Sequence, residues 1–179
     1  MEVSYRRPLA ADAARLAQVA RDTFVATFGH LYSEADLQPF LRESYDVTKT
    51  SRDIRDPETY ILLAEVNHAI VGFVQAGKMG LPFDIGGRAA REIKRLYVAE
   101  AAKGTGIAQA LMDASTQWAR EEGAQDLYLG VFSQNARAIA FYTRNGFSIV
   151  GAYYFMVGKT ADDERIMVRP LMPGAQSVA

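Results

Sequence analysis

The chain has 179 residues, of which 49% are hydrophobic and 23% charged, and its formal net charge is −1. These values are typical of a single globular domain, and they show neither the basic excess of a nucleic-acid-binding protein nor the apolar run of roughly 18 residues that a membrane span needs. The absence of cysteine excludes disulfides, thiolate metal sites and a cysteine nucleophile. Together with the lack of a signal-peptide pattern, it favours a cytoplasmic protein. The net charge and the lack of an apolar run favour a protein without nucleic-acid or membrane partners.

The first half of the chain contains both helix and strand patterns. Apolar residues at helical spacing follow Asp12, and Ser33 with Asp36 forms a capping-box pattern ahead of a second apolar stripe. Asn67-His68 separates two β-type runs, which predicts a hairpin. The expected elements are strand Val3–Arg6, helices Asp12–Thr27, Ser33–Tyr45 and Val47–Ile54, and strands Tyr60–Val66 and Ala69–Gly77.

In the second half, strands and helices alternate after a glycine-rich loop, Gly77–Ala90. The expected elements are strand Arg91–Val98, helix Ile107–Glu122, strand Asp126–Phe132, helix Asn135–Asn145, and strands Ser148–Val157 and Arg165–Arg169. A hairpin followed by alternating elements predicts one α/β (α+β) domain over residues 1–172, with one mixed sheet covered by helices. Residues 173–179 are expected to form a flexible tail.

Two glycines stand at the start of helix Ile107–Glu122, in the segment KGTGIA at residues 103–108. Glycine there lowers helix stability by roughly 0.5–1 kcal/mol relative to alanine, so another requirement must favour it. A helix N-terminus presents unpaired N–H groups and the positive end of the helix dipole, and glycine lets an anion approach them. The loop is therefore a candidate phosphate or pyrophosphate site, with a tight turn as the alternative.

Two common phosphate motifs do not fit this loop. The dinucleotide pattern G-x-G-x-x-G requires glycine where Gln109 stands, and its acidic residue would end the next strand, whereas Asp126 begins one. The Walker pattern requires Gly-Lys-Ser/Thr, but here lysine precedes glycine. A phosphate in this loop would have to be held differently.

A second segment, NARAIAFYTRNGF, follows at residues 135–147. Asn135, Ala138 and Tyr142 lie at positions i, i+3 and i+7 of the expected helix, so they share one face. An amide, a small residue and a phenol suit the wall of a narrow polar site better than a core. Taken alone, Asn135 is explained as a helix cap and Tyr142 as a packed aromatic.

In order and spacing, the strand EIKRLYV, the loop KGTGIA and the segment NARAIAFYTRNGF resemble the GCN5-related N-acetyltransferase (GNAT) superfamily, which uses acetyl-CoA. The resemblance covers Glu92–Phe147. It implies a mostly antiparallel, twisted sheet of six to seven strands with helices on both faces, and N-acetyl transfer without a metal. The flanking segments resemble the bacterial subgroup related to the polyamine N-acetyltransferase PaiA, which implies a small primary amine such as spermidine as the acceptor.

The resemblance also implies which residues bind coenzyme A. The family's phosphate loop, Gln/Arg-x-x-Gly-x-Gly/Ala, falls on Lys103, Gly106 and Ala108, with lysine in place of Gln or Arg. Main-chain groups of Leu96 and Val98 would pair with the pantetheine arm, and Asn135 would hydrogen-bond to it. The implied cofactor-binding residues are Leu96, Tyr97, Val98, Lys103, Gly104, Thr105, Gly106, Ile107, Ala108, Asn135, Ala138 and Tyr142.

Two side chains receive a catalytic role from the same resemblance. Tyr142 would lie near the thioester sulfur, where a phenol can protonate the departing CoA thiolate. Glu92, at the start of the strand that leads to Val98, is the candidate base for the acceptor amine. A solvated strand-end charge is the alternative for Glu92, and water or Tyr97 is the alternative proton acceptor.

The acceptor and the assembly stay open at this level. Residues 33–58 hold seven acidic and four basic side chains, a net charge of −3 that would either attract a polycation or form solvated helix faces. N-terminal or lysine acetylation of a protein would need an open groove, which the loop Lys78–Ala90 and the helix Ser33–Tyr45 would border. A catalytically idle acyl-CoA-binding module would keep the phosphate loop but have no use for Tyr142. Members of the superfamily are often dimers, so a homodimer is one expectation.

Overall fold

The computed structural model describes residues 2–171. The expected domain end at residue 172 and the expected tail 173–179 lie outside the described residues. The strands are β1 (Ser4–Arg6), β2 (Tyr60–Val66), β3 (Ala69–Lys78), β4 (Ala90–Val98), β5 (Asp126–Phe132), β6 (Ser148–Val157) and β7 (Thr160–Pro170), and the α-helices are α1 (Ala13–Phe28), α2 (Glu34–Ser44), α3 (Val47–Arg55), α4 (Ile107–Glu121) and α5 (Ala136–Arg144).

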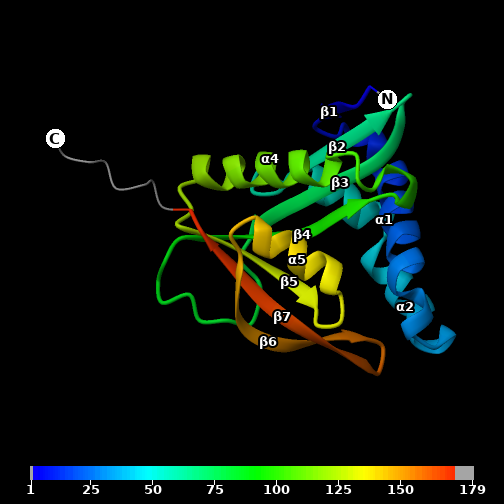
Figure 1. Ribbon diagram of the computed structural model, residues 1–179. Helices are drawn as coiled ribbons and strands as arrows, with labels where there is room; N and C mark the ends of the chain where they lie inside the picture. Colours follow the sequence, from blue (N-terminus) through cyan, green and yellow to red (C-terminus); the bar gives the residue numbers. More distant parts are fainter. Residues whose placement is uncertain (1, 172–179) are drawn as a thin grey trace.

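The seven strands form one sheet in the order β1-β2-β3-β4-β5-β7-β6 (Figure 1). Neighbouring strands are antiparallel except β4 and β5, which are parallel. This confirms the expected fold class, a mixed and mostly antiparallel sheet of six to seven strands. Within the described residues, no helix is both long and apolar enough to cross a membrane.

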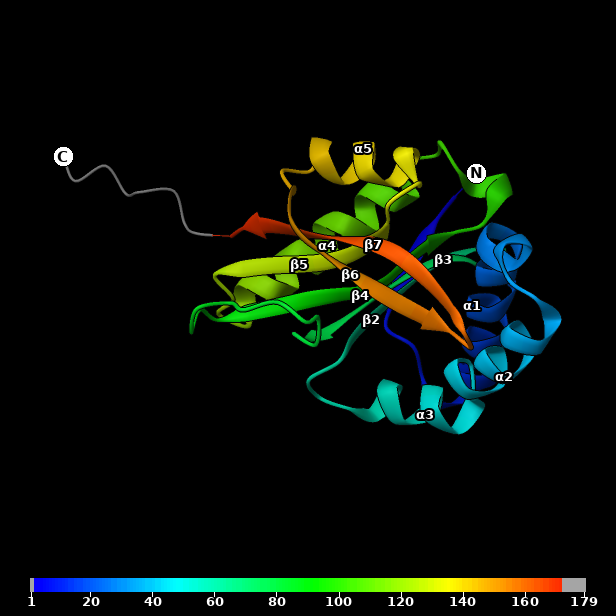
Figure 2. The same ribbon diagram turned by 90° about the horizontal axis from the view of Figure 1, so that it is seen from below.

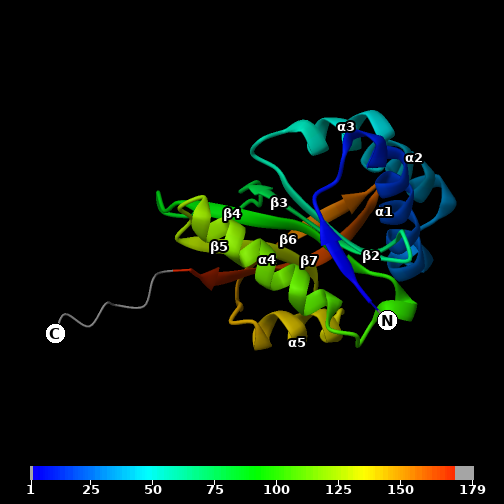
Figure 3. The same ribbon diagram turned by 90° about the horizontal axis from the view of Figure 1, so that it is seen from above.

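Helices cover both faces of the sheet, as expected. Helices α4 and α5 lie on one face, and α1, α2 and α3 lie on the other (Figures 2 and 3). Leu111 and Met112 of α4 pack with Val74 and Leu129 in one core cluster, whereas Phe24 of α1 belongs to a second cluster on the opposite face. The sheet therefore separates two layers, and only a break in the sheet can connect them.

Such a break exists between the two parallel strands. Their pairing covers only four residues of each strand and ends at Ile93 opposite Leu129. Beyond this point β4 remains paired with β3 through Val98 and β5 remains paired with β7 through Phe132. The two strands therefore diverge, and we call the space between residues 94–98 and 130–132 the β4–β5 gap.

The last strand differs from the sequence prediction. Arg165–Arg169 was the expected strand, but β7 begins at Thr160 and extends to Pro170. The missed part, Thr160–Glu164, pairs with β6 throughout, and Glu164 also faces Phe132 of β5. Its acidic sequence is unusual for a strand, and Asp162 and Glu164 share the sheet face that α1 and α2 cover, because alternate strand residues point to the same side.

Candidate active site

The edge of β4 that borders the gap has free main-chain groups. The Ala99 N–H donates to the Val71 carbonyl at 2.8 Å, so Ala99 forms a hydrogen-bonded pair with β3. Hydrogen-bonded and non-hydrogen-bonded pairs alternate along an antiparallel ladder. Leu96 and Val98 are therefore in non-hydrogen-bonded pairs, and their N–H and C=O groups point away from β3. Because β5 has diverged there, an extended ligand can pair with this edge as an added strand.

The glycine loop presents a row of free amides at the same end of β4. Gly104 and Gly106 have φ values of +80° and +86°, which favour glycine, and Gly106 is the N-cap of α4. Thr105 stabilises the loop by donating its hydroxyl to the Ala102 carbonyl at 2.6 Å. Within the described residues, the N–H groups of 104–108 have no main-chain acceptor. A Cβ at either glycine would meet no atom within 4 Å, so the space beside both α-carbons is open and an anion can approach the amides.

Helix α5 lies beside the gap on the α4 side (Figure 2). Its N-cap is Asn135, whose side-chain oxygen accepts from the Ala138 N–H at 3.1 Å. The capping role is thus present, and the amide NH₂ of Asn135 has no hydrogen-bond partner among the described residues. Ala138 is half-buried and leaves room next to that amide. Asn135 can therefore cap the helix with its oxygen and donate to a ligand with its nitrogen.

Tyr142 lies about one helical turn after Ala138 on α5. Its ring packs against Phe141 and Phe147, with ring centroids 5.6 and 5.9 Å away. Burial raises the pKa of its phenol, and the neighbouring Tyr97 and Glu164 raise it further. In the described part of the chain its hydroxyl has no hydrogen-bond partner, and no fully buried polar side-chain atom there lacks one, so this hydroxyl keeps contact with solvent. The phenol is a proton donor that stays protonated at neutral and moderately alkaline pH.

Lys103 has an ion-pair partner within the protein. Its ammonium forms an ion pair with Glu100, and both residues are exposed. The pair lies at the turn before Gly104. Lys103 therefore contributes positive potential near the loop, partly neutralised by Glu100, and the free amides of the loop carry most of the anion-binding capacity.

Glu92 is buried, with 6% of its surface exposed, so the alternative of a solvated strand-end charge is wrong. Its Oε2 accepts from the Gly80 N–H at 2.7 Å and from the Lys94 ammonium at 2.6 Å. It stands opposite Tyr128 in the paired part of β4 and β5, before the gap opens. Glu92 therefore lies in the paired part of β4, and it is near enough to Tyr153 to raise the pKa of that phenol.

A second acidic cluster, which the sequence analysis missed, borders the gap on the sheet face that α1 and α2 cover. The Tyr153 hydroxyl donates to Glu164 Oε2 at 2.7 Å, and the Tyr32 hydroxyl donates to Asp162. Burial raises the pKa of Glu164 above that of an exposed glutamate, whereas the hydrogen bond from Tyr153 lowers it. Alternating acidic residues opposite Tyr153 of the adjacent strand were the sequence signal for this cluster.

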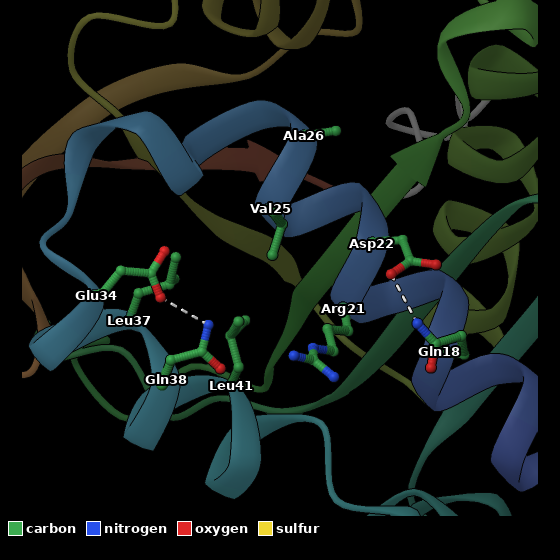
Figure 4. A pocket seen from close by; sticks show the side chains of 9 residues that line it. All are labelled: Gln18, Arg21, Asp22, Val25, Ala26, Glu34, Leu37, Gln38 and Leu41. Atoms are coloured by element: carbon green, nitrogen blue, oxygen red, sulfur yellow. Dashed lines mark hydrogen bonds between the residues drawn. The ribbon is translucent and has the colours of Figure 1, made fainter.

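Two hollows lie outside the gap. Helices α1 and α2 border a groove of about 480 Å³, in which Gln18 donates to Asp22 and Gln38 donates to Glu34 within their own helices (Figure 4). A hollow of about 400 Å³ opens beside α3. Its charged lining contains the acidic Asp53, Asp56 and Glu58 and the basic Lys49, Lys78, Lys94 and Arg95. Among residues 2–171, no group of three acidic or histidine side chains is arranged to hold a metal ion.

A mixed sheet with two diverging parallel strands, followed by a glycine loop at the start of a helix, defines the GNAT fold. The model of the acetyltransferase (GNAT) family matches residues 22–147, and the chain belongs to this family. An uncharacterized N-acetyltransferase of Mycobacterium tuberculosis is 31% identical over 161 residues, covering 90% of this chain and 99% of the relative.

Two further comparisons involve Thermoplasma acidophilum. Its spermidine N(1)-acetyltransferase is 26% identical over 153 residues, covering 83% of this chain and 90% of the relative. The crystal structure of the PaiA N-acetyltransferase from this organism, in complex with coenzyme A, superposes with a TM-score of 0.76 at 22% identity, covering 95% of this chain and 99% of that one. The resemblance predicted from the sequence is confirmed at the level of family and fold.

Proposed function

We propose that this protein transfers the acetyl group of acetyl-CoA directly to the primary amine of a small molecule. The observation that carries the proposal is that three groups of different chemistry border the β4–β5 gap: the open edge at Leu96 and Val98, the free amides of residues 104–108, and the Tyr142 phenol. An elongated amide-containing arm, a pyrophosphate and a thioester sulfur are the matching features of acetyl-CoA.

The residues present fit this cosubstrate. The loop amides would hold the pyrophosphate, the edge of β4 and the NH₂ group of Asn135 would bind the pantetheine arm, and Ala138 would leave space for it. Tyr142 would donate its proton to the sulfur as the C–S bond breaks. Tyr97 would contribute its main chain to β4 and its phenol to the opposite side of the gap.

The acceptor that we propose is a cationic small amine. Carboxylates on the α1–α2 side of the gap favour a cationic amine, and the spermidine-specific name of one relative supports a polyamine. The hollow beside α3 gives a polyamine no further support, because its four basic side chains outnumber its three acidic ones. A cytoplasmic location and a homodimer remain predictions from composition and resemblance.

The test is to follow thiol release from acetyl-CoA with a panel of small amines that includes spermidine, and with peptides that carry a free N-terminus or a lysine. Release that requires a small amine is the expected result. Release with peptides alone would replace this acceptor class by proteins. Binding of acetyl-CoA without release for any acceptor would identify an idle acyl-CoA-binding module and overturn the proposal.

A further inference from the structure

Gly130 marks the point at which β5 leaves β4. It directly follows Leu129, the last residue of β5 that pairs with β4. A Cβ at Gly130 would lie 2.5 Å from the Tyr153 hydroxyl oxygen and 3.0 Å from Glu164 Oε2. Two polar side chains from β6 and β7 therefore rest against the main chain of β5 at the start of the gap, in space that only glycine leaves open.

The carboxylate of Glu164 has one engaged and one free oxygen. Oε2 accepts from Tyr153 at 2.7 Å, and Oε1 has no hydrogen-bond partner among the described residues. By contrast, Glu92 lies in the closed part of the sheet and is bound by Lys94 and Gly80. Glu164 is half-buried, and of these two glutamates it is the one at the gap with a free oxygen that can accept a hydrogen bond from an incoming donor.

Phenols and carboxylates surround Glu164. Tyr153 and Asp162 act on the pKa of Glu164, and Glu164 in turn raises the pKa of Tyr32, Tyr97 and Tyr142. Glu92 also faces this cluster, because it raises the pKa of Tyr153. None of the groups that shift the pKa of Glu164 is a cation. Burial raises this pKa above the ordinary value, which makes the carboxylate a stronger base. An ammonium group is the ligand that such a site lacks.

We propose that Glu164, rather than Glu92, accepts the proton of the acceptor amine, with Gly130 and Tyr153 holding its carboxylate at the gap. This role rests on the proposed function. The R–NH₃⁺ group gives one proton to Glu164, and the neutral nitrogen forms a C–N bond with the thioester carbonyl carbon. The C–S bond breaks, Tyr142 protonates the sulfur, and the second proton of the nitrogen restores the Tyr142 phenol. The proton on Glu164 passes to solvent, which balances the reaction.

The test uses Glu164→Gln, an isosteric change that still accepts the Tyr153 hydrogen bond. We expect kcat with spermidine, or with the panel amine of highest turnover, to fall about 10²–10⁴-fold, and its acidic pH limb to be lost. The same variant is then assayed with the aminooxy analogue of each amine, in which oxygen replaces the CH₂ next to nitrogen. This analogue is neutral at the assay pH, so the defect should shrink to less than about 10-fold, because no base is needed to deprotonate it.

Asp163→Asn is the matched control, because Asp163 is the adjacent carboxylate on the opposite face, paired with Arg165 at 2.6 Å. It should keep wild-type turnover, and Glu164→Gln should keep the wild-type affinity for CoA and the wild-type Tm. An equal defect with amine and aminooxy acceptors would show a structural role and overturn the inference. Near-normal turnover of Glu164→Gln, with a large loss in Glu92→Gln, would assign the base to Glu92. An inactive wild-type protein would overturn the proposed function itself, and this inference with it.

Discussion

The two faces of the sheet are built in different ways. On the α4–α5 face, the proposed cosubstrate groups come from one continuous stretch, residues 96–142, and most of them are main-chain amides. On the α1–α2 face, the polar groups near the gap are side chains from distant parts of the chain, such as Tyr32 and Asp162, which form a hydrogen bond across 130 residues of sequence. The first face depends on local backbone geometry, and the second depends on how the whole domain folds.

This difference suggests that one face binds the cosubstrate and the other face binds and activates the acceptor. A cosubstrate of constant structure can be held by backbone groups that side-chain substitution leaves in place, whereas acceptor chemistry depends on side chains that can change without altering the fold. The following variants test whether the two faces separate in this way, so that one loses binding and the other loses turnover.

The largest effect is expected for Gly106→Glu. A side chain at φ +86° strains the loop, and a carboxylate among the amides repels a pyrophosphate by several kcal/mol, so CoA affinity should fall by about 100-fold or more. Isothermal titration with CoA measures it. Gly123→Glu is the matched control, because Gly123 has φ +73° and equally open surroundings but lies after α4. Unchanged affinity in Gly106→Glu would place the phosphate site elsewhere.

Tyr142→Phe should lower kcat by about 10²–10⁴-fold while CoA affinity changes little, since only the proton donor is lost. Because burial raises the pKa of Tyr142, the wild-type enzyme should also keep its activity at alkaline pH up to the limit of folding. Steady-state kinetics measure both. Tyr60 stacks on Trp118 away from the gap, so Tyr60→Phe should leave kcat unchanged. Wild-type turnover in Tyr142→Phe would remove this residue as the acid.

Gly130→Ala should lower kcat by about 10–100-fold, because the added methyl group displaces Tyr153 and Glu164 by about 1 Å from the gap. CoA affinity should not change. Gly77→Ala on β3 is the control, since its Cβ would meet no atom closer than 3.6 Å. Normal turnover in Gly130→Ala, with a structure that shows Tyr153 and Glu164 displaced, would show that these two side chains take no part in the reaction.

The smallest effect is expected for Lys103→Ala, with CoA affinity lowered by less than about 3-fold, because exposed ion pairs are worth little and Glu100 already partners the ammonium. Glu100→Gln should raise the affinity slightly by freeing Lys103. Titration at low ionic strength, where such effects are largest, measures both. A loss in Lys103→Ala as large as that in Gly106→Glu would show that this side chain contacts the phosphates directly.

The sequence predicted the α4–α5 face because its signals are local. Strand β5 was predicted with the bounds that the structure has, and Asn135 caps α5 as its propensity indicates. The left-handed glycines at 104 and 106 follow from the same local reading. Each of these features depends on a few adjacent residues.

The other face could not be predicted in the same way. The segment TADDE at residues 160–164 is typical of a turn, and its strand structure comes from pairing with Tyr153 and its neighbours on β6. A solvated strand end was the alternative for Glu92 as a base, and the bond from Gly80, in the loop that precedes β4, could not be predicted from the residues around Glu92. Polar residues that contradict a local structural rule are common at functional sites, and the turn-like sequence around Glu164 is such a case.

The most direct test of the central claim, that CoA binds along the β4–β5 gap, is an NMR titration of ¹⁵N-labelled protein with CoA. We predict the largest amide shift changes at residues 104–108 and at Leu96 and Val98, with little change in the groove between α1 and α2. Shift changes concentrated in that groove, with none in the glycine loop, would contradict this claim.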